Sequence, residues 1–345
     1  MAAVAATALA SGCATQSSVK SALAPLPETV TSFGAATSDG WLYAFGGHKG
    51  ERHDYSFEMV SGSFQRLKLS DGQKWEKLPS AAPGQGLALV AYNGELYRVG
   101  GMAARNHEAE HDTLTKQKLY SLPLVQHFNP RDGRWEDLAP LPSPRSSHDA
   151  VVLGHKLYVA GGWDLSGSVG KPVWHTNALV LDLDQPQAGW REFPQPFQRR
   201  GLALAALGTQ VFCIGGMSSD NETSLAVDIY DTATGLWSKG PDLPDGQYKG
   251  FSCSAIAQNG HVYAATLQGD LLRLSDDERS WEVVGRLEHP RMAYRLVTAG
   301  KSQLIALGGE DGEEEKISGL ELLTPSAKPL PATPVAATAQ ASNLH

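Results

Sequence analysis

The stretch LGHKLYVAGG, residues 153–162, decides the fold because a segment of this kind occurs six times in the chain. In each copy a polar turn precedes an alternating apolar run of strand length, which ends in a pair of glycines. In one copy Thr266 and Leu267 replace the glycines. Self-similarity of this kind indicates a repeat architecture. The copies are SDGWLYAFGG (38–47), YNGELYRVGG (92–101), LGHKLYVAGG (153–162), LGTQVFCIGG (207–216), QNGHVYAATL (258–267) and GKSQLIALGG (300–309).

A second marker recurs in phase with the first. A tryptophan follows most of the later turns in the repeats, and strand-like runs such as AVDIY lie between the two markers. Each repeat therefore carries four short strands, which is one blade of a β-propeller. The prediction is an all-β chain with six blades. The marker residues are Trp75, Trp135, Trp190, Trp237 and Trp281.

This organisation resembles the kelch family, in which a double glycine ends the second strand of a blade and a tryptophan begins the fourth. The resemblance implies one six-bladed kelch propeller over residues 19–325. Its sixth repeat lacks the tryptophan, whereas LAPLP at 23–27 repeats LAPLP at 138–142, where the fourth strand of the second blade ends. We therefore expect an N-terminal strand near residues 19–24 to close the ring beside residues 319–325, which would leave no free sheet edge there.

The two ends of the chain differ from the repeats. Residues 1–18 begin with a short apolar run that ends in LASGC (9–13), which has the pattern of an export signal and resembles a bacterial lipobox. Lipidation of Cys13 would make the protein an exported periplasmic or outer-membrane lipoprotein, held to the membrane only by its lipid. Residues 326–345 are rich in proline and alanine and are expected to form a disordered tail.

Composition narrows the classes of partner. The chain has 345 residues and a formal net charge of −8, which disfavours a nucleic-acid partner because phosphate binding depends on lysine and arginine. Its 3 cysteines form no CxxC pair and have no zinc spacing with histidine, so a zinc module is not supported. Histidine-rich loop runs without a fixed strand or helix framework are weak evidence for another metal, so we expect no metal and no cofactor.

The candidate site lies in the loops on one face of the ring, where propellers carry their function. Loops that lead into the innermost strands are rich in cations, namely Arg145, Arg199, Arg200, Lys249, Arg291 and Arg295. Cations gathered around a concave mouth favour an anionic ligand. The outer loops add further candidates that could contact a sugar or its hydroxyls, namely Arg52, Arg105, Trp163, Trp174 and His175.

Register places some of these residues relative to one another. Counting back from the hairpin turns puts Phe33, Leu87, His148, Leu202, Cys253 and Arg295 at one level of the six blades. Blades three and six are opposite in such a ring, so His148 and Arg295 are expected to face each other. Arg145 and Arg199 share a level three residues nearer the rim.

The expected function is that of a cell-envelope binding or interaction module for a carbohydrate, an acidic small ligand or a protein partner. Its ligand-binding candidates include Arg145, His148, Arg199 and Arg295. The alternative rests on a weaker resemblance to bacterial kelch mutarotases, which interconvert sialic acid anomers. That reaction needs a group that moves protons, for which the candidates are His148, His175 and Glu51, and a cation that holds the substrate carboxylate.

Overall fold

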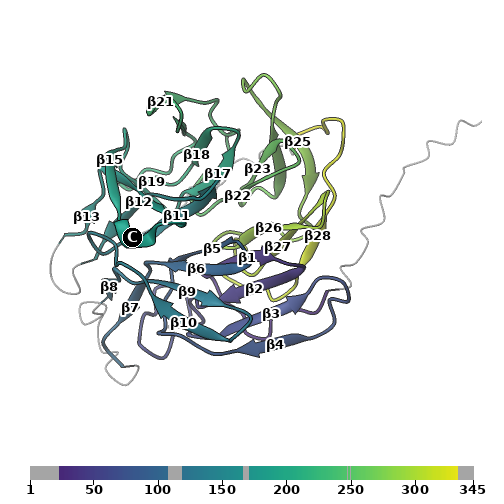
Figure 1. Ribbon diagram of the computed structural model, residues 1–345. Helices are drawn as coiled ribbons and strands as arrows, with labels where there is room; N and C mark the ends of the chain where they lie inside the picture. The colour runs from purple at the N-terminus through teal and green to yellow at the C-terminus, as the bar shows by residue number, and fades with distance from the viewer. Residues whose placement is uncertain (1–22, 108–118, 166–170, 247, 249, 333–345) are drawn as a thin grey trace, which may run out of the picture.

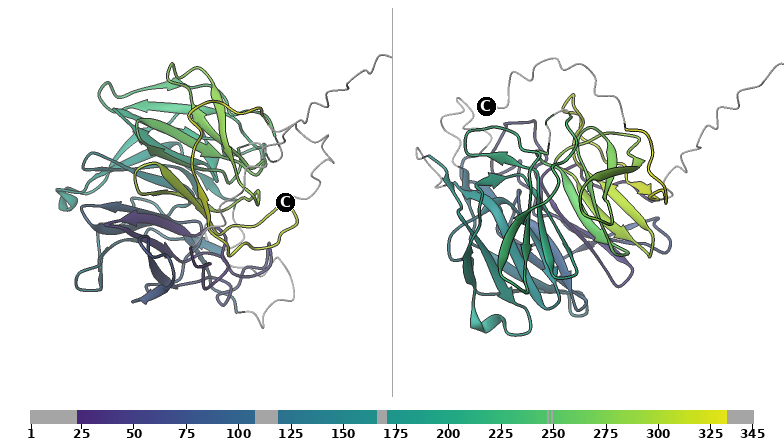
Figure 2. Two further views of the ribbon diagram at one scale, coloured as in Figure 1. Left: turned by 90° about the vertical axis from the view of Figure 1, so that its right-hand side faces the viewer. Right: turned by 90° about the horizontal axis from the view of Figure 1, so that it is seen from above.

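The computed structural model describes residues 23–107, 119–165, 171–246, 248 and 250–332. Within these residues the protein is all-β, with one 3-10 turn at Pro186–Ala188. Six antiparallel sheets stand side by side around a common centre, and their innermost strands β1, β5, β11, β17, β22 and β26 face it (Figures 1 and 2). The predicted six-bladed propeller is confirmed.

The first three blades each have four strands in the order expected for a blade, from the centre outward. Short extra strands extend the loops of blades two and three on the face that carries the glycine pairs. Blade one consists of β1 (Gly34–Ser38), β2 (Trp41–Phe45), β3 (Phe64–Lys68) and β4 (Trp75–Leu78); blade two of β5 (Ala88–Tyr92), β6 (Glu95–Val99), β9 (Val125–Asn129) and β10 (Arg134–Asp137), with β7 (Met102–Ala104) and β8 (Leu119–Ser121); blade three of β11 (Ser146–Leu153), β12 (Lys156–Asp164), β14 (Asn177–Asp182) and β15 (Arg191–Pro194), with β13 (Val173–Trp174).

Blades four and five repeat this arrangement, while blade six has three strands among the described residues. Blade four consists of β17 (Ala203–Leu207), β18 (Gln210–Ile214), β20 (Val227–Asp231) and β21 (Leu236–Lys239), with the pair β16 (Arg199–Arg200) and β19 (Met217–Ser218); blade five of β22 (Ser254–Gln258), β23 (His261–Ala265), β24 (Asp270–Leu274) and β25 (Trp281–Arg286); blade six of β26 (Arg295–Ala299), β27 (Gln303–Leu307) and β28 (Glu321–Leu323).

The inner strands form because their sequences suit a sheet that is covered on both faces. Strands β2, β18 and β27 are short runs of apolar residues in which four of five positions are buried. The core is divided into clusters that lie between neighbouring blades; one of them joins Phe212 of blade four to Val262 of blade five. Packing between blades therefore holds the ring together.

Six backbone hydrogen bonds close the ring at its centre. In each blade a residue at or just before the start of the innermost strand donates its N–H to the carbonyl of the equivalent residue in the preceding blade, at N···O distances of 2.6–3.2 Å. All six have φ between 51 and 59°, in the left-handed region that favours glycine. We call this ring the collar; its members are Ser32, Gly86, Ser147, Gly201, Ser252 and Ala293.

The five marker tryptophans join neighbouring blades. Each donates its indole N–H to a carbonyl at or just after the end of the fourth strand of the preceding blade: Trp135 to Pro79, Trp190 to Ala139, Trp237 to Pro194 and Trp281 to Pro241. Trp75 donates in the same way to Ala24, at 3.0 Å. Ala24 therefore lies where the fourth strand of blade six would end.

The expected closing strand falls mostly outside the described residues, as do the export signal and Cys13. Its described end has the expected register: Leu26 donates its N–H to Ser318, as Leu141 does to Pro123 in blade two. After β28 the chain turns to blade five, where Ser326 and Leu330 donate to Val284 and Val283 of β25. The rest of the expected tail, 333–345, also lies outside the described residues. No helix in the described part of the chain has the length and apolarity to span a membrane.

Candidate functional site

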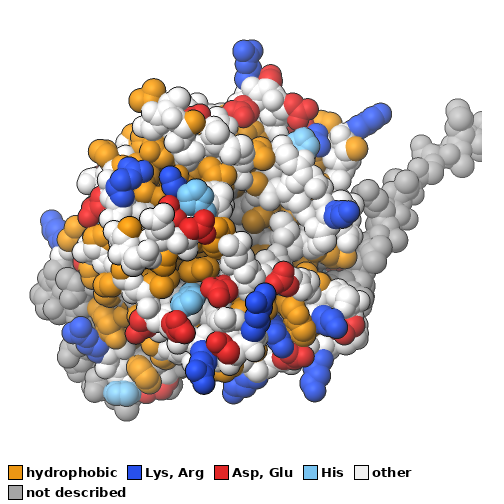
Figure 3. All heavy atoms as spheres, viewed as in Figure 1, with side chains coloured by type: hydrophobic (Ala, Val, Ile, Leu, Met, Phe, Trp, Pro, Cys, Tyr) orange, Lys and Arg blue, Asp and Glu red, His pale blue; other side chains and the backbone are white. Residues whose placement is uncertain are grey.

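The candidate site is a cavity of about 350 Å³ at the centre of the ring. It is visible as a hollow in Figure 3. All six collar residues line it, together with residues from two further rings. One ring comes just before the collar in sequence and contributes Thr31, Gln85, Arg200, Phe251 and Met292; the other follows the glycine pairs and contributes His48, Met102, Trp163, Met217 and Glu310.

Backbone pairing explains why these two rings meet. The residue before the collar and the residue after the glycine pair form antiparallel bridges within a blade, as in Thr31 with His48 and Gln85 with Met102. In blade four the same pairing is the short ladder that puts Arg200 opposite Met217. The repeat therefore delivers a side chain from each of several blades to the same cavity.

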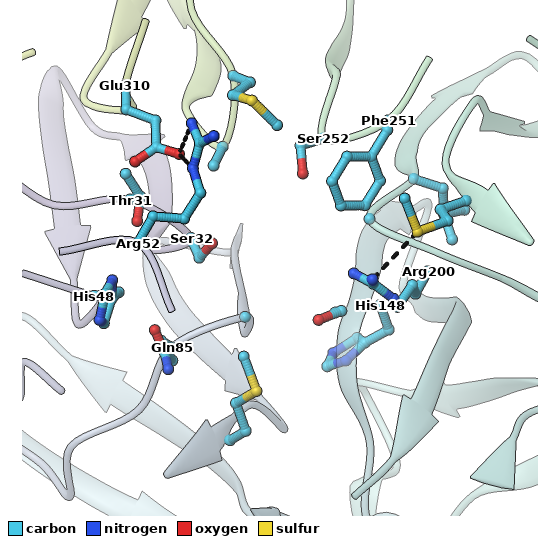
Figure 4. Close-up of a pocket in the computed structure, with 18 of the residues that line it drawn as sticks. Thr31, Ser32, His48, Arg52, Gln85, His148, Arg200, Phe251, Ser252 and Glu310 are labelled. Carbon is cyan, nitrogen blue, oxygen red and sulfur yellow. Dashed lines mark hydrogen bonds and ion pairs between the residues drawn. The ribbon is translucent and has the colours of Figure 1, made fainter. Parts of the chain in front are cut away.

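Arg200 is the cation that distinguishes this cavity. Its guanidinium carbon lies 4.2 Å from the ring centroid of Trp163 and 5.1 Å from that of Phe251, and Nη2 lies 3.2 Å from the Met217 sulfur. Figure 4 shows Arg200 beside Phe251. Its Nε is buried and has no hydrogen-bond partner, and no carboxylate pairs with Arg200 in the described part of the chain. Burial lowers the pKa of Arg200 to about 10, so the group stays charged at neutral pH.

Other donors around the cavity also lack partners. The amide nitrogen of Gln85 and the indole nitrogen of Trp163 are buried without a hydrogen bond among the described residues. Gln85 is only 1% exposed. Since buried donors are nearly always paired, these groups indicate a site whose hydrogen bonds are completed by a ligand or by water.

His148 lies one residue beyond the collar and lines the cavity. It is 3% exposed, and neither ring nitrogen has a hydrogen-bond partner of ordinary geometry among the described residues. Burial and the nearby cation Arg145 hold the pKa of His148 well below its usual value, so its imidazole is neutral at pH 7.

The wall that faces Arg200 across the cavity carries paired charges (Figure 4). Arg52 donates from Nε to Glu310 at 2.8 Å and pairs through Nη1 with Glu314, also at 2.8 Å. His48 contacts the backbone oxygen of Asp54 through Nε2 at 2.8 Å. Arg52, a predicted ligand contact, therefore lines the cavity with its charge already compensated.

Arg295 also lines the cavity, but not at the level expected from the sequence. The blade-six hairpin turn has three residues, 300–302, where the other blades have two, so Tyr294 shares the level of His148 and Arg295 shares that of Asp149. Arg295 donates to the backbone oxygens of Phe33 and Leu87 and to the carboxylate of Asp149. The prediction that Arg295 lies at the level of His148 is therefore wrong by one residue, because Tyr294 occupies that level.

Arg145 and Arg199 do not line the cavity. They are 0% and 4% exposed, and both donate through Nη1 to the first glycine carbonyl of their own blade, Gly161 and Gly215, at 2.8 Å. Arg291 makes the equivalent bond to Gly308 in blade six. These guanidiniums already donate hydrogen bonds within their own blades. The expected ligand-binding role of Arg145 and Arg199 therefore does not fit their placement.

The remaining sequence candidates lie around the cavity rather than in it. The buried His175 contacts the Pro144 oxygen at 3.1 Å, and Trp174 packs edge-on against Trp163. Arg105 lies over the ring of Tyr120, 4.4 Å from its centroid, and the exposed Glu51 does not line the cavity. Of the three candidate acid–base residues, His148 is the one that the structure places in the cavity.

Sequence reasoning missed Gln85, Phe251 and the methionines, and it did not separate Arg200 from Arg199. Neighbouring residues on a strand point to opposite sides, so Arg199 enters its blade while Arg200 enters the cavity. The signal that could have found most of these residues is their position immediately before the collar or after the glycine pair.

Comparison with known proteins supports the repeat analysis. Residues 29–266 match the family model described as the KLHDC2/KLHL20/DRC7 Kelch-repeats domain. Beta-scruin of Limulus polyphemus is 30% identical over 228 residues, which are 64% of this chain and 23% of the relative. Kelch-like protein terF of Aspergillus terreus is 28% identical over 228 residues, which are 64% of this chain and 46% of the relative. The chain thus spans less than half of either relative.

A solved structure gives the same picture of the fold. The structure of YjhT superposes with a TM-score of 0.70 and covers 90% of this chain and 99% of its own, at 18% sequence identity. At that identity the likeness shows the propeller fold alone.

Proposed function

The chain belongs to the kelch-repeat family, and we propose that it is a binding module that holds the anionic group of an acidic ligand in its central cavity. Kelch propellers are typically interaction modules. A volume of about 350 Å³ is in the range of small-molecule sites, so the cavity suits a small acid. We also propose a cell-envelope location, which the export-signal pattern of residues 1–18 supports.

The proposal rests on Arg200, which has no carboxylate partner among the described residues. A guanidinium removed from water without a partner costs several kcal/mol, so such groups are normally paired. Among the described residues that line the cavity, the other two arginines are compensated, Arg52 by Glu310 and Arg295 by Asp149. Arg200 thus leaves an uncompensated positive charge facing the cavity, which an anion would neutralise.

The surroundings of Arg200 favour recognition rather than a purely structural role. Contacts with Trp163, Phe251 and Met217 hold the guanidinium in one place before a ligand arrives, which lowers the entropic cost of binding. A carboxylate can accept charge-assisted hydrogen bonds from such a fixed group. The buried amide nitrogen of Gln85 and the indole nitrogen of Trp163 also have no hydrogen-bond partner among the described residues.

The test compares Arg200→Gln with Arg191→Gln, since Arg191 is an exposed arginine over Phe193 that does not line the cavity. Saturation-transfer NMR with a mixture of acetate, 3-phenylpropionate and N-acetylneuraminate reports which acid binds. We expect at least one acid to bind the parent and Arg191→Gln, and to be lost in Arg200→Gln. Binding of no acid, or equal binding by all three proteins, would show that the proposal is wrong.

One observation favours a second candidate function, the sugar mutarotase. Neutral His148 lines the cavity, and its ring nitrogens make no hydrogen bond of ordinary geometry among the described residues. A neutral imidazole can both accept and donate a proton. Anomer exchange of N-acetylneuraminate, followed by NMR, should then be faster with the parent than without protein. His148→Gln should abolish the acceleration and retain binding. If the parent gives no acceleration, this candidate is excluded.

A further inference from the structure

We propose that the ligand of Arg200 is a monocarboxylate with an apolar body, rather than a sugar acid or a phosphate. This inference rests on the proposed function and narrows it to one class of ligand. Three properties of the cavity support it: the balance of charge among its lining residues, the contacts that its aromatic side chains make with protein groups, and the methionines in its lining.

The balance of charge limits the ligand to a single negative charge. Arg200 is the one cation lining the cavity for which the described residues hold no carboxylate. Glu310 also lines the cavity, on the opposite wall, and is compensated by Arg52 (Figure 4). A dianion such as a phosphate ester would bring a second negative charge that no further cation compensates, and it would be repelled by Glu310. A monocarboxylate avoids both costs.

The two aromatic side chains beside Arg200, Trp163 and Phe251, are engaged with protein groups rather than open to a sugar ring. Arg200 lies over the ring of Trp163, and Trp174 packs edge-on against that ring with centroids 5.3 Å apart. The Phe251 ring also lies beside the guanidinium. These contacts flank the cation with hydrocarbon, so the part of the ligand next to its carboxylate meets apolar surface.

The methionines extend this apolar surface. Three of the five methionines in the chain line the cavity. Met102 and Met292 are 9% and 5% exposed, whereas Met217 is fully buried. Leu119 and Leu165 add to this lining. Thioether side chains are flexible and polarisable, so they adapt to apolar ligands of differing shape. Sugar hydroxyls placed against the methionine and leucine side chains would lose hydrogen bonds to water without replacement there. An aromatic or alkyl body gains by the same contact.

Isothermal titration of four probes tests the inference: 3-phenylpropionate, its neutral amide, glucuronate and phenyl phosphate. We expect 3-phenylpropionate to bind at least about tenfold more tightly than each of the other three, which is the effect of one charge-assisted hydrogen bond or one well-buried apolar group. Arg200→Gln should weaken it by about ten- to hundredfold, and Arg191→Gln should leave it unchanged. Met292→Gln should weaken 3-phenylpropionate and so reduce its advantage over glucuronate.

The outcomes separate this inference from the function on which it rests. If glucuronate or phenyl phosphate binds as tightly as 3-phenylpropionate and depends on Arg200, the anion site stands and the inference is overturned. If the neutral amide binds as tightly as the acid, the negative charge of the ligand has no role, and both the inference and the proposed function are wrong. If Arg200→Gln binds every acid as tightly as the parent does, both the inference and the proposed function are also wrong.

Discussion

Arg295 Nη1 lies 3.0 Å from Asp149 Oδ1, which joins blade six to blade three across the centre of the propeller. The same arginine donates to the carbonyls of Phe33 in blade one and Leu87 in blade two, both at 2.8 Å. Asp149 Oδ2 accepts from the backbone N–H of Leu204 in blade four, at 2.9 Å. One ion pair therefore ties five blades together at the edge of the cavity.

Replacing Arg295 by alanine should destabilise the whole ring. The change leaves the largely buried Asp149 carboxylate without its cation, and losses of about 3–5 kcal/mol are typical when one partner of a buried pair is removed. Arg66→Ala is the matched control, because its partner Glu76 is exposed and such surface pairs contribute about 0–1 kcal/mol. Urea unfolding measures both. Equal losses in the two variants would mean that the central pair contributes no more than a surface pair.

Acidification should destabilise the protein through its buried histidines. Burial lowers the pKa of His175 to about 4, against an ordinary value of 6.5 in the unfolded chain. Between these values the unfolded chain binds a proton that the folded protein does not, so stability falls as the pH drops below 6.5. The slope is up to about 1.4 kcal/mol per pH unit for one histidine.

His175→Gln should therefore show a shallower loss of unfolding free energy than the parent between pH 6.5 and 5. The comparison uses the difference between the two proteins, because other groups contribute to both curves. His155→Gln is the control, since that histidine is 48% exposed in its side chain. Parallel curves for the parent and His175→Gln would contradict the prediction.

Gly215→Ala should cost more stability than Gly208→Ala. Both glycines have positive φ, of 67° and 61°, so both substitutions pay a similar conformational cost of about 1 kcal/mol. A Cβ at Gly215 would also clash with the backbone oxygen of Gly250, whereas nothing lies within 4 Å of a Cβ at Gly208. Thermal unfolding of the two variants measures the difference. A Gly208 variant that melts at or below the Gly215 variant would show that close approach between blades is not what the glycine pair provides.

Removal of residues 14–22 should lower the melting temperature, whereas removal of 2–13 should not. The bonds of Ala24 to Trp75 and of Leu26 to Ser318 lead the chain toward β28, whose outer edge has no strand beside it among the described residues. A groove of about 780 Å³ runs along that edge. We expect residues 19–22 to occupy it and so to satisfy the edge. Identical melting of both truncated proteins would exclude this closure.

The repeat could be predicted from sequence because each blade needs the same features at the same place. The glycines permit close approach of backbones, and the tryptophans reach the preceding blade, so their spacing alone indicated six blades. The site was harder to predict, because its residues are defined by contacts between strands. Arg199 and Arg200 are adjacent in sequence, yet Arg199 donates a hydrogen bond within its own blade and Arg200 lines the cavity. The one-residue error at Arg295 came from a single longer turn.

A crystal structure of the protein with 4-bromobenzoate tests whether Arg200 binds a carboxylate in the central cavity. Anomalous scattering from bromine locates the acid independently of its carboxylate. We expect the acid in the cavity, with a carboxylate oxygen about 3 Å from a guanidinium nitrogen of Arg200 and the bromine toward the methionines. An acid found only outside the cavity, or in the cavity with its carboxylate away from Arg200, would contradict it.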